Sequence, residues 1–184
     1  MVKSKFFILT IFLLFISNCA TSYGPGRIDI KDTFSIDFEN TWKSPHDPKS
    51  DYLLLTSADG KSEFKMEFFS GLEDGKPLYY WTKGNNFRKN MTNKQIALLY
   101  SDAMAITGFE NEVSKIEPSK IGPFDGFMFE VKMNKKGKNV RSLVAGMVID
   151  EKLFLIQFEV EEEKLFLKHI GFFKAMLASI KSIE

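Results

Sequence analysis

The chain of 184 residues is long enough for one domain with a sizeable hydrophobic core. Its 25 basic and 24 acidic residues nearly cancel, which argues against a nucleic-acid partner, since such a partner requires a strongly basic face. One cysteine and two histidines are too few for a histidine- or cysteine-rich zinc or copper site, or for an internal disulfide. We therefore expect a fold stabilised by packing, with no metal and no cofactor.

The chain starts with a short basic segment followed by an apolar run. Lys3 and Lys5 precede residues 6–16, which are apolar except for Thr10. At about 1.5 Å per residue, this run spans about half of a ~30 Å hydrocarbon core. Its length and flanks favour an export signal over a transmembrane helix.

The apolar run is followed by the only cysteine, and residues 15–19 read Phe-Ile-Ser-Asn-Cys. This segment resembles the lipobox of bacterial lipoproteins, in which a branched apolar residue and two small residues precede the cysteine that receives a diacylglycerol. Asn18 stands where Gly, Ala or Ser is usual. The resemblance implies a signal peptide over residues 1–18 and acyl chains on Cys19, which would hold the protein at a membrane. The alternative is an ordinary signal peptide with a chance cysteine.

The next residues predict a tether and then the first strands. Residues 20–32 contain Gly, Pro, Ser and Thr with little apolar content, so residues 19–32 are expected to form the lipidated N-terminus and a short flexible tether. Thr33 to Phe38 alternates apolar and polar residues, which predicts a half-buried strand, and Trp42 follows in a turn-rich stretch. Residues 52–57 and 64–69 predict two further strands, with a turn at 58–61.

The first helix has a clear start signal. Thr92 and Gln95 have the spacing of a capping box, and Met91 with Ile96 has the spacing of a hydrophobic staple. Gly108 is placed to end the helix. The residues expected on its buried face are Ile96, Leu99, Tyr100, Ala103 and Ile106.

The second half of the chain predicts a meander and a closing helix. After a short strand near residues 113–116, three strands are expected at 127–133, 140–149 and 153–160, with turns at 134–137 and 150–151. Two of these strands are apolar on both faces, which predicts a sheet covered on both sides. A helix is expected at about 162–180, with an acidic first turn. Its expected inward face consists of Phe166, Ile170, Phe173, Leu177 and Ile180.

These elements predict an α+β fold: one domain over residues 33–184, with a mostly antiparallel sheet and helices on both faces. Three features are similar to the PsbP-like α/β/α sandwich domains, which include the bacterial lipoprotein DcrB. They are the first strand leading to Trp42, the late meander and the closing helix ending at residues 176–183. Asn40 and Thr41 stand where a proline commonly precedes the Trp. The resemblance implies binding to or assembly with other proteins, and no single reaction, because fold alone does not deliver function.

A search for catalytic residues finds no signature. His169 lies inside the closing helix, where packing against the sheet edge is the expected role, and His46 lies in a loop bracketed by prolines, where Asp47 predicts an Asx-type turn. Serine-hydrolase and phosphate-loop motifs are absent from the sequence. Acid pairs among Asp51, Asp59, Glu67 and Asp74 are expected by chance in a chain with 24 acidic residues. We therefore expect no enzymatic activity.

Two surfaces are candidates for contact with a partner. Tyr79, Tyr80, Trp81 and Phe87 offer rigid amphipathic rings for a ligand or protein groove, although such rings also serve to cover one side of a sheet. A basic cluster on the hairpin near residue 136 could touch anionic lipid head groups, although such a run is more often a solvated turn. The residues of this cluster are Lys135, Lys136, Lys138 and Arg141.

The sequence thus favours a bacterial envelope lipoprotein, anchored through Cys19, that acts without catalysis as a binding or assembly factor for an envelope protein. Ala20 is not the Asp that retains lipoproteins at the inner membrane in the enterobacterial scheme, which tilts the expectation toward the outer membrane. The alternative is a carrier or sensor of a small apolar ligand held between sheet and helix.

Overall fold

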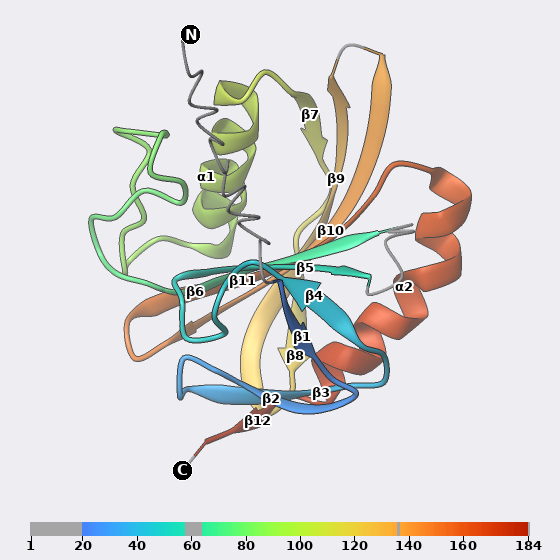
Figure 1. Cartoon of the computed structure of the whole chain (residues 1–184). Helices are drawn as coiled ribbons and strands as arrows, with labels where there is room; N and C mark the ends of the chain where they lie inside the picture. Colours follow the sequence, from blue (N-terminus) through green and yellow to red (C-terminus); the bar gives the residue numbers. More distant parts are fainter. Residues whose placement is uncertain (1–19, 58–63, 136, 184) are drawn as a thin grey trace, which may run out of the picture.

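The computed structural model describes residues 20–57, 64–135 and 137–183 (Figure 1). The expected signal peptide, Cys19, the turn at 58–61 and Lys136 lie outside the described residues, as does the side chain of Lys135. Within the described residues, no helix is long and apolar enough to cross a membrane.

Nine strands of the described chain form one large antiparallel sheet. Its strands are β1 (Thr21–Tyr23), β4 (Trp42–Ser44), β5 (Tyr52–Ser57), β6 (Lys65–Leu72), β7 (Glu110–Val113), β8 (Glu117–Ile121), β9 (Phe124–Lys135), β10 (Lys138–Ile149) and β11 (Lys152–Val160). They follow the order β1-β4-β5-β6-β11-β10-β9-β7, and β8 pairs with the first part of β9. The predicted meander is therefore confirmed as β9, β10 and β11.

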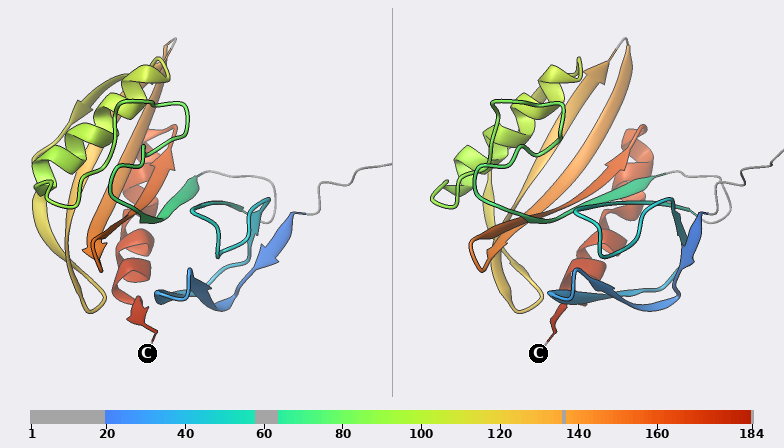
Figure 2. Two further views of the ribbon diagram at one scale, coloured as in Figure 1. Left: turned by 90° about the vertical axis from the view of Figure 1, so that its left-hand side faces the viewer. Right: turned by 60° about the vertical axis from the view of Figure 1, so that its left-hand side comes forward.

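A smaller sheet and two helices cover the large sheet. The smaller sheet has the order β12-β3-β2, built from β2 (Gly26–Ile30), β3 (Phe34–Phe38) and β12 (Lys181–Ser182). Helix α1 (Asn93–Ile106) packs on one face of the large sheet, whereas α2 (Glu163–Ala178) and the smaller sheet pack on the other (Figure 2). This arrangement confirms the predicted α+β fold with helices on both faces.

The core lies on both sides of the central strands. In β11, Phe154, Ile156 and Phe158 belong to the cluster packed under α2, whereas Leu153 and Leu155 belong to the cluster packed under α1. Successive side chains of a strand point to opposite faces, so a strand covered on both faces is apolar throughout. This explains the near-continuous apolar runs in the sequence.

Helix α1 begins and ends as the sequence predicts. The Thr92 hydroxyl accepts a hydrogen bond from the backbone N–H of Gln95, and the Gln95 side chain accepts one from the Thr92 N–H, which confirms the capping box. After Thr107, Gly108 takes a positive φ and the N–H of residue 109 donates to the Met104 carbonyl, as in a Schellman motif. Ile106, expected on the buried face, is instead 55% exposed.

Helix α2 is confirmed with a shorter range. Phe166, Phe173 and Leu177 lie on the inward face of α2 and are buried, while Ile170 is half-buried. Ile180 is buried as well, but it lies beyond the last helical residue, where the chain leaves α2 toward β12. The closing segment thus fills the core from α2 and from the connection that follows it.

The expectation of a flexible tether over residues 20–32 is wrong for its described part. Thr21–Tyr23 pairs with Trp42–Ser44, and Gly26–Ile30 pairs along its whole length with β3. Ile30 is fully buried. Apolar residues at alternate positions, Ile28 and Ile30, were the signal of this strand, because β2 buries one face only. The folded unit therefore starts before residue 33.

Two further local expectations are corrected. Trp42 belongs to β4, where pairing with β5 and packing under α2 bury its ring, and not to a turn. The single strand expected at residues 113–116 is replaced by two strands: β7 ends at Val113 and β8 starts at Glu117. Both pair with the long β9, at different parts of its length.

Candidate functional site

Strand β6 leads into a long loop, residues 73–92, which we call the aromatic loop; it runs beside α1 and is drawn in light green (Figure 1). Leu78 and Phe87 are buried and join the cluster under α1, while the side-chain amide of Asn85 donates to the Leu99 carbonyl at 2.8 Å. Phe87 was expected on a binding surface; it is 0% exposed and serves as a core residue instead. The loop is thus anchored at both ends to the same core.

Aromatic rings from the segment before β5, from β5, from β6 and from the aromatic loop form a continuous chain. The ring of His46 meets Tyr52 at a centroid distance of 5.3 Å, and Tyr52 meets Phe69 at 5.3 Å. Phe69 meets Tyr79 edge to face at 5.0 Å, and Tyr79 stacks on Trp81 at 4.7 Å. Edge-to-face and offset contacts of this kind stabilise aromatic pairs beyond simple burial. The chain of contacts therefore holds Tyr79 and Trp81 in fixed positions.

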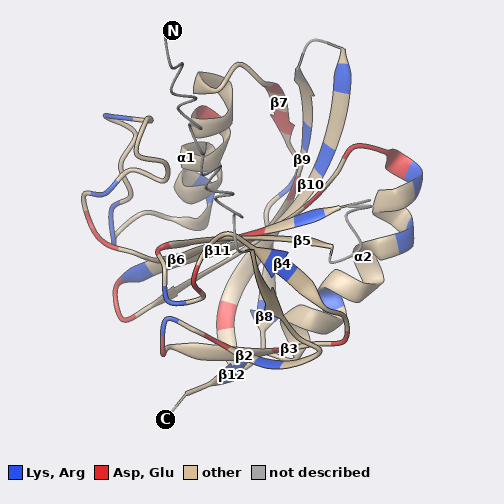
Figure 3. Cartoon of the chain, viewed as in Figure 1, with Lys and Arg blue, Asp and Glu red and all other residues tan. Residues whose placement is uncertain are grey.

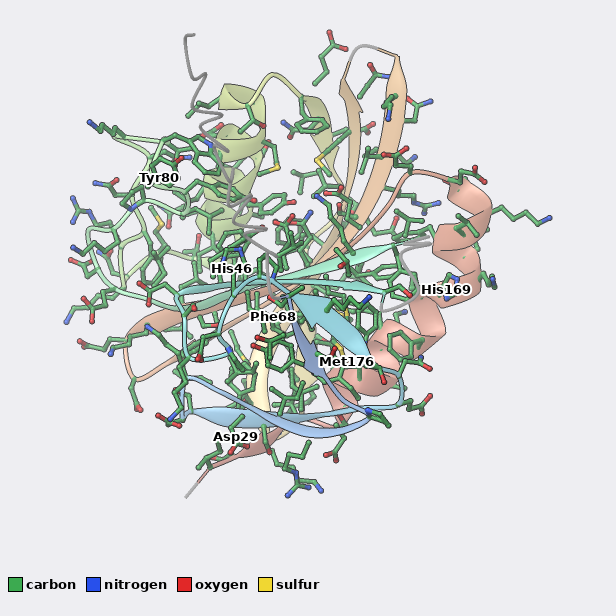
Figure 4. All side chains as sticks on the ribbon, viewed as in Figure 1. Asp29, His46, Phe68, Tyr80, His169 and Met176 are labelled. Atoms are coloured by element: carbon green, nitrogen blue, oxygen red, sulfur yellow. The ribbon has the colours of Figure 1, made fainter. Side chains whose placement is uncertain are left out.

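These rings line a groove of about 710 Å³ between the aromatic loop and the ends of β5 and β6, which we call the aromatic groove. Tyr80 is 81% exposed and Trp81 46% exposed at its mouth, next to each other at 4.6 Å. Figure 4 shows Tyr80 and His46 on the same side of the molecule, away from α2. The rim carries charges of both signs, contributed by Lys31, Asp51, Glu73 and Lys76. Three of the four predicted surface aromatics thus come together.

Below the aromatic groove, four polar side chains lie on the α1 face of β6 and β11, and we call them the buried polar cluster: Lys65, Glu67, Gln157 and Glu159. Strand register places Gln157 opposite Glu67 and Glu159 opposite Lys65. The Lys65 ammonium lies 3.0 Å from Glu67 Oε1 and 3.0 Å from Glu159 Oε1. The hydroxyl of Tyr79 donates to Glu67 Oε2 at 3.3 Å. One lysine therefore bridges two glutamates, and the aromatic loop is tied to one of them.

The buried polar cluster was missed by the sequence interpretation, which considered Glu67 only in chance acid pairs. The available signal was the alternation of β6 and β11: Lys65, Glu67, Gln157 and Glu159 occupy the positions that continue the apolar α1 face. Polar residues at core positions of two strands indicate a shared network if the strands pair. That pairing could not be deduced from the sequence.

Burial and charge shift several pKa values in this region. Burial raises the pKa of the Glu159 carboxyl, and the Lys65 ammonium opposes that rise. Burial also opposes charging of Lys65, but Glu67 and Glu159 together raise its pKa. Burial and the adjacent Glu67 raise the pKa of Tyr79, which keeps its hydroxyl protonated as the donor to Glu67. The cluster is therefore built around carboxylates that are desolvated and only partly neutralised.

Replacing Glu159 with Gln should stabilise the protein at pH 7 and have little effect at pH 4. The folded protein holds the Glu159 proton more tightly than the unfolded chain does, since the pKa is raised above 4.5. The stabilisation contributed by the protonated Glu159 carboxyl is therefore fully present below its unfolded pKa and is lost as the pH rises through its folded pKa. Gln carries no charge at either pH, so the variant does not suffer this loss. Thermal unfolding of Glu159→Gln and wild-type protein at both pH values tests this. A larger gain in Tm at pH 4 than at pH 7 would contradict it.

The two histidines lie apart, on different elements, and the ring of each one contacts another aromatic ring. Asp47 Oδ1 accepts from the Lys49 N–H at 2.7 Å, which is the expected Asx-type turn, while the ring of His46 contacts Tyr52. His169 lies on α2 (Figure 4). Its ring packs against that of Phe64 at a centroid distance of 4.6 Å. In the part of the chain that the structure describes, no three His, Cys, Asp or Glu side chains are grouped so that they could hold a metal ion.

The basic hairpin does not present the expected free charges. Arg141 is 17% exposed, donates to Glu130 at 2.7 Å, pairs with Glu163 and lies 4.3 Å over the ring of Phe166. Lys138 pairs with Glu161 at 3.6 Å. Figure 3 shows acidic residues on β7 and at the start of α2 flanking this basic hairpin. Arg141 is therefore engaged within the fold, and contact of the basic cluster with lipid stays a prediction.

No protein-family model matches the chain, and no curated protein matches it either. Solved structures share its fold. Cyanobacterial PsbP (CyanoP) from Synechocystis sp. PCC 6803 superposes with a TM-score of 0.60 at 13% identity, covering 88% of this chain and 91% of that one. The Ran-binding protein Mog1p of Saccharomyces cerevisiae superposes with a TM-score of 0.54 at 10% identity, covering 90% and 97%. At these identities the likeness establishes a PsbP-like fold.

Proposed function

We propose that this chain is a non-catalytic binding or assembly factor of the bacterial envelope, held at the membrane by acyl chains on Cys19. The observation that supports the binding role is the pair Tyr80 and Trp81, 81% and 46% exposed at the mouth of the aromatic groove. Large rings fixed by their neighbours lose little conformational entropy when a partner covers them, so they are suited to carry binding energy. That Mog1p, which has the same fold, is a Ran-binding protein supports a protein partner.

Site-specific crosslinking in the native envelope tests the binding surface. A photo-reactive residue at position 80 is expected to capture one envelope protein, whereas the same residue at position 167 is not. Leu167 is the matched control because it is 62% exposed but lies on α2, which packs on the opposite face of the large sheet. Equal capture from both positions would contradict the assignment of the aromatic groove as the binding surface.

Substitution of the aromatic residues gives a second measure. Trp81→Ala is expected to weaken partner binding by about 2 kcal/mol or more, which is roughly 30-fold, because interface tryptophans are frequent hot spots. Leu167→Ala should leave binding unchanged. Affinity for the captured partner, measured by calorimetry, provides the comparison.

The anchor is tested separately with Cys19→Ala. The proposal expects this variant to lose its membrane association and to capture a different set of proteins. An unchanged captured set would show that tethering does not organise the function. The outer membrane is the proposed location, on the basis of Ala20, and separation of the two membranes by density tests it.

The alternative of an apolar-ligand carrier is not favoured by the small pocket between the large sheet and the end of α1. This pocket of about 220 Å³ is lined by Lys65, Glu67 and Glu159, together with aromatic rings. Charged side chains disfavour an apolar ligand because binding would remove their remaining solvation without replacing it. A co-purified apolar molecule, sought by mass spectrometry, would revive the carrier hypothesis.

A further inference from the structure

A second pocket lies over the buried polar cluster, on the other side of the wall of the aromatic groove. It has a volume of about 220 Å³ and shares the side chains of Tyr52, Tyr79 and Trp81 with the groove wall. Its floor is polar: Lys65 and Glu67 of β6, and Gln157 and Glu159 of β11. The pocket therefore combines carboxylates below with aromatic rings at the side.

The charges on this floor do not balance. Glu67 and Glu159 have side-chain exposures of 8% and 14%, and the described residues bring a single ammonium, that of Lys65, to both of them. Each carboxylate oxygen can accept more than one hydrogen bond. One lysine with two carboxylates thus leaves one negative charge uncompensated in a poorly solvated place, where a charge is unfavourable unless it is paired.

Gln157 provides an independent observation. It is 1% exposed, and its Nε2 donates to Glu159 Oε2 at 2.8 Å and to the Ser142 hydroxyl at 3.3 Å. Its carbonyl oxygen, Oε1, is buried and accepts no hydrogen bond from any described residue. Most buried side-chain acceptors are satisfied, so an orphaned acceptor on a pocket floor indicates a position for a donor. The donor required is the same kind of group that the excess negative charge requires.

We propose that this pocket binds the protonated primary amine of an alkylammonium ligand. The ammonium donates to Glu67, Glu159 and Gln157 Oε1, which satisfies the orphaned acceptor and completes the charge balance. The rings of Tyr79 and Trp81 line the wall beside it, where a cation is attracted to the aromatic face and the alkyl chain packs on the rings. Its volume of about 220 Å³ suits the ammonium and a short alkyl chain. The site stands independently of the proposed partner-binding role of the groove.

The binding test uses the full chain in detergent and n-butylammonium as the probe. Titration is followed by the indole N–H signal of Trp81 in ¹⁵N NMR spectra. Saturation with a Kd of about 1 mM is expected, because a few heavy atoms rarely supply more than a few kcal/mol. n-Butanol, which lacks the charge, and tetramethylammonium, which lacks N–H donors, should bind at least about tenfold more weakly. Equal responses to all three compounds would overturn the proposal.

Variants distinguish the named acceptors from general charge effects. Glu67→Gln and Gln157→Leu should each weaken n-butylammonium binding at least about tenfold, since hydrogen bonds to a charged group are the strong ones. Asp125→Asn is the matched control, because Asp125 is 92% exposed, pairs with Lys120 and does not line the pocket. Gln157→Leu also removes the hydrogen bonds from Nε2 to Glu159 and Ser142, so its folding is checked by thermal unfolding before its affinity is compared. Unchanged affinity in folded Gln157→Leu would overturn the assignment of its oxygen.

Two sources of the alkylammonium are separated by the same titration. Cadaverine represents a free amine, and a blocked Ala-Lys-Ala peptide represents the lysine side chain of a protein. Stronger binding of the peptide would support a partner's lysine, and stronger binding of cadaverine would support a free amine. Failure of both to bind would overturn the ammonium site while leaving the crosslinking test of the aromatic groove unaffected.

Discussion

Replacing Phe158 with Ala is expected to lower the free energy of unfolding by about 3–5 kcal/mol, because the substitution leaves a cavity in the core. Phe158 lies on β11 and is 0% exposed. Its ring meets those of Phe64, Phe166 and Phe173 at centroid distances of 5.2, 5.9 and 5.4 Å. It therefore joins the large sheet to α2, and the neighbouring rings cannot all move to fill the space.

Urea unfolding measures this loss, with Leu167→Ala as the control. Leu167 is on α2 too but is 62% exposed, so its truncation should change stability by less than about 0.5 kcal/mol. A loss below about 1 kcal/mol for Phe158→Ala would show that α2 is not held to the sheet by this aromatic cluster. Total stabilities of about 5–15 kcal/mol make the expected loss a large share of the whole.

Gly122→Ala is expected to be the most damaging of the small substitutions. Gly122 begins the two-residue turn between β8 and β9 with a φ of +55°, and a Cβ added there would lie 2.1 Å from the carbonyl oxygen of Ile180. That oxygen belongs to the backbone that leaves α2, so a flexible side chain cannot relieve the clash. Overpacking and the left-handed backbone together predict a loss of about 2–5 kcal/mol.

Gly84→Ala is the matched control for this prediction. Gly84 has a φ of +91°, and a Cβ added there meets nothing within 4 Å. The two substitutions share the left-handed conformation and the change in unfolded-chain entropy, so the difference between their urea midpoints isolates the contact with Ile180. Equal losses in the two variants would mean that the turn and the end of α2 are not in close contact.

Elements whose signals lie close together in the sequence were predicted well. The start of α1 depends on Met91, Thr92, Gln95 and Ile96, which are neighbours along the chain, and its capping box is present in the structure. The turn at Asp150 and Glu151 was predicted as well, and both residues take the positive φ of a two-residue hairpin turn. Apolar runs on both faces of β10 and β11 correctly indicated a sheet between two layers.

Predictions that depended on distant partners were less successful. Residues 26–30 resemble a linker in composition, yet pairing with β3 makes them a strand of the smaller sheet. Phe87 has the same local setting as Tyr80 and Trp81, but only the fold shows that it points into the core. Arg141 was expected in a basic cluster on the hairpin, but its guanidinium pairs with Glu130 and Glu163 of other elements.

The sequence by itself determined the class of the fold, the order of most elements and the expectation of an anchor at Cys19, which stays a prediction. These features follow from local periodicity, capping and turn residues, and from the spacing of an N-terminal signal. Only the tertiary structure decided which side chains form the candidate sites. Lys65 and Glu159 meet because β6 pairs with β11. Such pairings depend on the packing of the whole core, which a short segment of sequence does not determine.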